Sequence, residues 1–110
     1  MIEHTIQKIE ARLRNAPLMS KENREELLKL LATLKAEVTD LSATHGEAAE
    51  SIAGFTDVSS YEATRQASDQ QLLDLSLEGL SKSVSGFETS HPKLVQLVNR
   101  IATILSNLGV

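Results

Sequence analysis

Apolar residues recur at alternating spacings of four and three through most of this chain, and this spacing restricts its fold more than any other feature. The longest run is Leu27, Leu31, Leu34, Val38 and Leu41. Residues at this spacing lie on one face of an α-helix. We therefore predict an all-α protein built from two antiparallel helical hairpins, which form a four-helix bundle or a coiled-coil-like assembly.

The first hairpin is expected to span residues 2–42. A stripe at Ile2, Ile6, Ile9 and Leu13 marks its first helix, which we expect to stop at Asn15, Ala16 and Pro17 because proline disfavours the helical conformation in the residue before it. Ser20 is the predicted N-cap of the second helix, and acidic residues follow it near the positive helix end.

The second hairpin is expected to span residues 69–109. Its first helix begins after a predicted capping box of Ser68 and Gln71. The stripe continues through Leu73, Leu77, Leu80, Val84 and Phe87. The stretch LLDLSLE also alternates as a strand does, but it holds no β-branched residue and the helical stripe is longer, so we predict a helix.

The last helix is expected to start at Pro92, which is favoured as a first helical residue. We interpret His91 as the extended residue before this proline, where its ring caps or covers the helix start, and not as a catalytic or metal-binding group. Gly109 is predicted to end the helix in a Schellman motif, with Val110 packed on Leu105.

The middle of the chain differs in composition. Residues 37–79 hold nine acidic residues and one cation, Arg65, within a net charge of −4 for the whole chain. Residues 43–68 are rich in Ser, Thr, Ala and acids, and we interpret them as an acidic linker or a frayed helix. The alternatives are one long helix that reaches Phe55, and a stretch FTDVSSYEA that docks loosely on the bundle.

No constellation for catalysis or metal binding is visible. The chain has no cysteine, and His4, His45 and His91 lie in different segments. It lacks a Gly-rich phosphate loop, a nucleophile elbow, a HExxH helix and the Glu-x-x-His of di-metal bundles. We therefore expect no enzyme activity, no cofactor and no metal.

Two stretches resemble a known family: SKENREELLKLLATLKAEV, and FETSHPKLVQLVNRIATILSNLGV, whose matching residues are Phe87, His91, Pro92, Leu94 and Leu108 to Val110. In this order they are similar to the bacterial family called domain of unknown function 4404. The resemblance implies a small soluble helical protein with an N-terminal hairpin and a His-Pro, Leu-rich last helix. It implies no activity and no functional residue.

The apolar stripes are wider than the seam of a two-stranded coil, so we expect self-association, with a dimer favoured. The predicted interaction stripe consists of Leu27, Leu31, Leu34, Val38, Leu41, Leu73, Leu77, Leu80, Leu94, Val98, Ile101 and Leu105.

The predicted function is a non-enzymatic helical interaction or scaffolding protein. The alternative is a regulatory adaptor that binds a basic or amphipathic-helical protein partner through the acidic middle segment. Too few cations are clustered for nucleic acid or membrane binding. With no signal-like or membrane-spanning stretch and no cysteine, we expect a cytoplasmic location.

Overall fold

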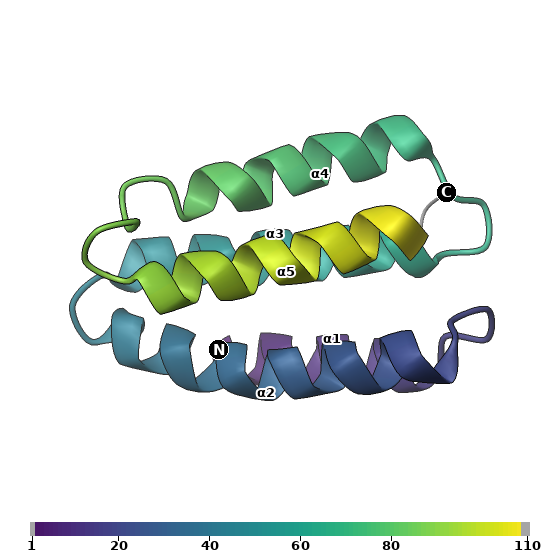
Figure 1. The fold of residues 1–110 in the computed structure, drawn as a ribbon, viewed down its shortest axis with the longest axis horizontal. Coiled ribbons are helices and arrows are strands. Elements are labelled where there is room, and N and C mark those ends of the chain that lie inside the picture. Colours follow the sequence, from purple (N-terminus) through teal and green to yellow (C-terminus); the bar gives the residue numbers. More distant parts are fainter. Residues whose placement is uncertain (1, 109–110) are drawn as a thin grey trace.

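Five helices and no strand make up residues 2–108, the part of the chain that this computed structural model describes. The helices are α1 (Ile2–Arg14), α2 (Lys21–Ser42), α3 (Gly46–Thr64), α4 (Gln70–Ser83) and α5 (Pro92–Leu108) (Figure 1). They run lengthwise in a bundle of 37 × 24 × 22 Å. The all-α prediction is confirmed, but the helices number five and not four.

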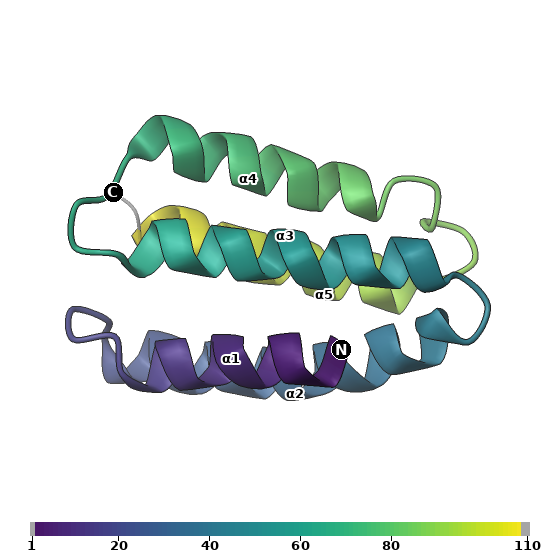
Figure 2. The same ribbon diagram turned by 180° about the vertical axis from the view of Figure 1, so that it is seen from behind.

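Helix α3 is the central element, because it packs against each of the other four. Helices α1 and α2 pair on one side of it, and α4 and α5 lie on the other. Helix α5 covers one face of α3 (Figure 1), and on the opposite face α3 lies open between α1 and α4 (Figure 2). The side of α3 that faces the viewer in Figure 2 therefore has no other helix packed over it.

The α1 to α2 hairpin begins and ends as its sequence predicts. The hydroxyl of Ser20 caps α2 by accepting a hydrogen bond from the backbone N–H of Asn23 at 3.1 Å. Arg24 fastens the connecting loop, because its guanidinium donates to the carbonyl of Leu13 at 3.0 Å and to those of Ala16 and Met19. Arg24 thus supplies a partner for one carbonyl in the last turn of α1 and for two carbonyls of the loop that follows it.

The interpretation of residues 43–68 as a linker needs correction, because most of this segment forms α3. The chain turns at residues 43–45, so the alternative of one long helix reaching Phe55 is wrong too. Ala49, Ile52 and Thr56 of α3 are each at most 1% exposed. A helix surrounded by four others needs small side chains, and the Ser, Thr and Ala content that suggests a linker allows this close approach.

The buried hydroxyls of α3 are satisfied within their own helix. Thr56 donates to the carbonyl of Ile52 at 2.7 Å, and Ser60 donates to that of Asp57 at 2.8 Å. Such bonds to a preceding turn let Ser and Thr lie inside a bundle without an unpaired polar group. Ser59 is the exception among the described residues, because its fully buried hydroxyl has no hydrogen-bond partner.

The second hairpin differs from its prediction in detail. Asp69, and not Ser68, caps α4 by accepting from the N–H groups of Gln71 and Leu72 at 3.0 and 3.2 Å. An ionised carboxylate is a stronger acceptor than a hydroxyl, and Ser68 donates instead to the carbonyl of Glu62 at 3.5 Å.

Helix α4 ends at Ser83, so Val84 and Phe87 lie in the loop that follows it. Pro92 opens α5 as predicted. The predicted Schellman motif at residues 109–110 lies outside the described residues.

Candidate functional site

The twelve residues of the predicted interaction stripe lie inside the bundle. Eleven of them are at most 1% exposed, and Leu77 is half-buried against the same core. They come from α2, α4 and α5 and pack together around α3. In this structure these residues stabilise the fold of a single chain, and their burial leaves them inaccessible from the surface.

Most of the exposed large apolar side chains lie elsewhere, along the line where α3 packs against α4, and we call this line the groove. Phe55 and Val58 of α3 are 40% and 48% exposed, and Leu72 and Leu75 of α4 are 43% and 57% exposed. We call these four residues the α3–α4 strip. Side chains of this size usually lose more of their surface on folding, so four of them in one groove mark a surface suited to a partner.

A close contact fixes the register of the two helices in this groove. A Cβ atom at Gly79 would lie 2.3 Å from the ring of Phe55, so the ring rests directly on the backbone of α4. Leu72, Leu75 and Gly79 are spaced three and four apart and therefore share one face of α4. Because Gly79 meets Phe55, these two leucines lie on or next to the side of α4 that meets α3. The two helices are antiparallel, so Val58, which is three residues after Phe55, lies at about the level of Leu75.

Tyr61 continues the exposed surface of α3 toward α1. It is 47% exposed, and the guanidinium groups of Arg12 and Arg65 lie 5.6 and 5.8 Å from its ring centroid. Cations at this distance from an aromatic face are attracted to it. Arg65 is held in place by Glu62, with 3.0 Å between Nε and Oε1.

An ionic cluster joins α1 to α3 beside Tyr61. Arg12 donates to the carboxylate of Asp57 at 2.7 Å and to the hydroxyl of Ser60 at 2.7 Å, and Lys8 lies 3.1 Å from the same carboxylate. Burial would raise the pKa of Asp57, but hydrogen bonds and positive charge from Arg12 and Lys8 outweigh it, so this pKa lies below its ordinary value. The cluster therefore secures α1 against the central helix.

Folding brings two of the three histidines together at one end of the bundle. His45, in the turn between α2 and α3, lies 6.2 Å from His91, measured between ring centroids, and Phe87 contacts both rings edge to face at 5.4 and 5.5 Å. The Nδ1 atom of His45 is hydrogen-bonded to the hydroxyl of Thr44, and that of His91 to the hydroxyl of Ser90, so each histidine pairs with the residue before it. The prediction that the His91 ring caps or covers the start of α5 stays a prediction, because the ring contacts that the structure shows are with His45 and Phe87. The ring thus helps to join two loops.

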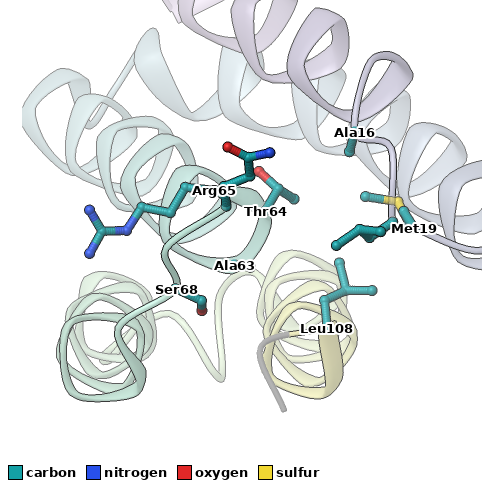
Figure 3. A pocket seen from close by; sticks show the side chains of 9 residues that line it. Ala16, Met19, Ala63, Thr64, Arg65, Ser68 and Leu108 are labelled. Carbon is teal, nitrogen blue, oxygen red and sulfur yellow. The ribbon is translucent and has the colours of Figure 1, made fainter.

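A pocket of about 290 Å³ opens at the other end, where the α1 to α2 loop meets the ends of α3 and α5 (Figure 3). Ala16, Met19, Ala63 and Leu108 contribute its apolar lining. The guanidinium of Arg65 points away from it (Figure 3). The pocket is at the lower end of the size range of small-molecule sites, and among the described residues it has no charged group aimed into it.

Two further observations concern residues 2–108. No three His, Cys, Asp or Glu side chains among them are close enough together to hold a metal ion. None of the described helices has both the length and the apolar character that crossing a membrane requires.

The fold and the groove define a small all-α bundle with a central helix and an exposed apolar strip. The chain belongs to the family described as Domain of unknown function (DUF4404), whose sequence model matches residues 29–110. This confirms the resemblance that the His-Pro and leucine motifs indicate. The match includes the whole strip and leaves out Lys8 and Arg12 of α1. No curated protein and no solved structure matches the chain.

The strip has a signal in the sequence that the leucine spacing obscures. Leu72 and Leu75 lie off the stripe of Leu73, Leu77 and Leu80. Because Leu75 falls between Leu73 and Leu77, the stretch LLDLSLE alternates as a strand does. Apolar residues on two faces of one helix indicate two packing partners. Here one face packs on the core, and the other is left half exposed beside α3.

Proposed function

We propose that this chain is a non-enzymatic interaction module that binds an amphipathic helix of a partner protein in the α3–α4 strip. The observation that carries this proposal is the exposure of Phe55, Val58, Leu72 and Leu75 in a single groove, by 40–57% each. It keeps the interaction role expected from the sequence and moves the working surface from the core leucines to the middle segment.

The shape of the strip favours a helical partner. Two antiparallel helices form the walls of the groove, and Leu72 to Gly79 extends over about 10 Å, or two helical turns. A helix that lies in such a groove buries apolar residues at i, i+3, i+4 and i+7. An isolated exposed leucine such as Leu18, which is 93% exposed in the α1 to α2 loop, offers no comparable surface.

Self-association stays a prediction. With the predicted stripe in the core, a second copy of the chain would have to use the same α3–α4 strip or open the bundle. Light scattering over a dilution series tests this, because a strip-dependent dimer would lose mass when Leu75→Asp is introduced, whereas Leu18→Asp would leave it unchanged.

Site-specific photo-crosslinking in the source cell tests the proposed function. A photoreactive phenylalanine analogue replaces Val58 or Leu75 in the strip, and Leu18 serves as the matched control because it is more exposed but lies outside the groove. We expect a discrete protein adduct at positions 58 and 75 and none of the same mass at position 18. Adducts that are absent from the strip, or equal at all three positions, would contradict the proposal.

A further inference from the structure

We infer that the helix bound in the α3–α4 strip is basic: its apolar face covers the four strip residues, and Lys or Arg residues flank that face. This inference rests on the proposed function and adds the chemistry of the partner. The charges of the side chains around the strip indicate this chemistry.

Acidic side chains border the strip and most lack an ionic partner. Five acids of α3, α4 and the α4 cap form no ion pair with any described residue: Glu47, Glu50, Asp69, Asp74 and Glu78. All five are exposed. The remaining two acids, Asp57 and Glu62, are paired with cations of α1 and with Arg65. In the same part of the described chain, Lys82 is the one cation without such a pair.

These acids lie on several sides of the groove. Asp74 and Glu78 are spaced four apart on α4 and lie next to the leucine face, on the flank away from α3. Glu47 is in the first turn of α3, before Phe55, and Asp69 is at the start of α4, before Leu72. Glu50 is the exception, because it lies on the α1 side of α3, where it lines a hollow together with Ile2 and Thr5. A helix in the groove would therefore have carboxylates beside it and beyond both ends.

The same charges disfavour a second copy as the occupant. A two-fold contact of strip on strip would bring four of these unpaired carboxylates in each chain toward those of the other, with only Lys82 to offset them. A basic helix instead gains from the same field, which steers its approach and fixes its position over the apolar residues. Charge complementarity therefore selects a cationic amphipathic helix over a copy of this chain.

The test uses three synthetic peptides of about 18 residues, which is five helical turns. The first carries leucine at i, i+3, i+4 and i+7 spacing with lysine on the polar face. The second keeps the leucines and replaces each lysine by glutamate, and the third is a scramble of the first with no apolar face. Fluorescence anisotropy measures their binding to the purified full chain at low and at physiological salt.

We expect the Leu/Lys peptide to bind at least about tenfold more tightly than either other peptide, with affinity that falls as salt rises. Leu75→Asp gives the sharpest check, because it adds a negative charge while removing an apolar contact. Attraction by charge alone would strengthen binding to this variant, whereas docking in the strip should weaken it about tenfold or more. Leu18→Asp is the matched control and should leave the affinity unchanged.

Charge reversal tests the flanking acids. The double variant Asp74→Lys, Glu78→Lys should weaken the Leu/Lys peptide by about tenfold at low salt, while Glu22→Lys on α2, away from the strip, should have a much smaller effect. Equal binding of the Leu/Lys and Leu/Glu peptides in the strip would overturn the inference and leave the proposed function standing. Failure of the Leu/Lys peptide to bind, binding that Leu75→Asp does not weaken, or a strip-dependent dimer would also overturn it.

Discussion

Ser59 lies in the second half of α3 with its hydroxyl buried and, among the described residues, without a hydrogen-bond partner. The next residue, Ser60, is also buried, but its hydroxyl accepts from Arg12 at 2.7 Å and donates to the carbonyl of Asp57 at 2.8 Å. These two adjacent serines are both buried, but only the hydroxyl of Ser60 has hydrogen-bond partners.

Replacing each serine by alanine should therefore have opposite effects. Ser59→Ala removes an unpaired buried hydroxyl and improves helix propensity, so we expect the free energy of unfolding to rise by about 1 kcal/mol. Ser60→Ala removes a charge-assisted hydrogen bond and should lower it by about 1 kcal/mol. Urea unfolding at pH 7 measures both. A loss of stability in Ser59→Ala similar to that in Ser60→Ala would contradict this description of α3.

Asp57 should make the stability of the bundle depend on pH. Its pKa in the folded chain lies below the unfolded value of about 3.9, because Arg12 and Lys8 favour the ionised form. A lowered folded pKa stabilises the native state at pH values above the unfolded pKa, and this stabilisation is lost as the pH falls through the folded pKa.

We expect Asp57→Asn to lower the free energy of unfolding by about 1–2 kcal/mol at pH 7, where the half-exposed Lys8 contributes little. The difference from the unmodified chain should stay constant down to about pH 5, shrink below about pH 4 and disappear in stronger acid. Urea unfolding of both proteins between pH 2.5 and 7, at constant ionic strength, measures it. A difference that grows as the pH falls would show that the sign is wrong.

At the scale of the elements, helix spacing predicts α1, α2, α4 and α5 because each has a leucine or isoleucine stripe that faces the core. It does not predict α3, whose buried face consists of small residues such as Ala49, Thr56 and Ser60. Small polar residues have low helix preference and resemble a linker when they are considered alone. Their helix forms because four neighbours bury it, and that information lies in the rest of the chain.

Two glycines within helices test whether α3 and its contact with α4 are as described. A Cβ at Gly54 meets no atom within 4 Å, whereas one at Gly79 meets the ring of Phe55 at 2.3 Å. Gly54→Ala should raise the free energy of unfolding by up to about 1 kcal/mol through helix propensity alone. Gly79→Ala should gain clearly less, because the Phe55 ring must move outward to admit the methyl group.

Urea unfolding measures these two variants under identical conditions. No gain from Gly54→Ala would indicate that residues around 54 are not helical. An equal gain in both variants would indicate that Phe55 does not rest on α4.

For the whole molecule, the sequence correctly predicts a helical bundle, but the leucines that it assigns to an interaction surface are buried in the core of the single chain. Spacing identifies leucines such as Leu31, Val38 and Ile101 as interacting residues without telling whether the partner is another chain or another helix of the same one. The answer depends on the number of helices. A fifth helix in the middle covers the stripes, and Phe55, Val58, Leu72 and Leu75 are left half exposed.

The central claim is that partners bind the α3–α4 strip of an intact bundle whose leucine stripes stay inside. Methyl and amide NMR shifts of the labelled chain, titrated with the Leu/Lys peptide, test it most directly. We expect the largest shifts at Phe55, Val58, Leu72 and Leu75, while the signals of Leu31 and Ile101 keep their unbound positions. Shifts centred on the core leucines of α2 and α5, with loss of the native spectrum, would contradict it.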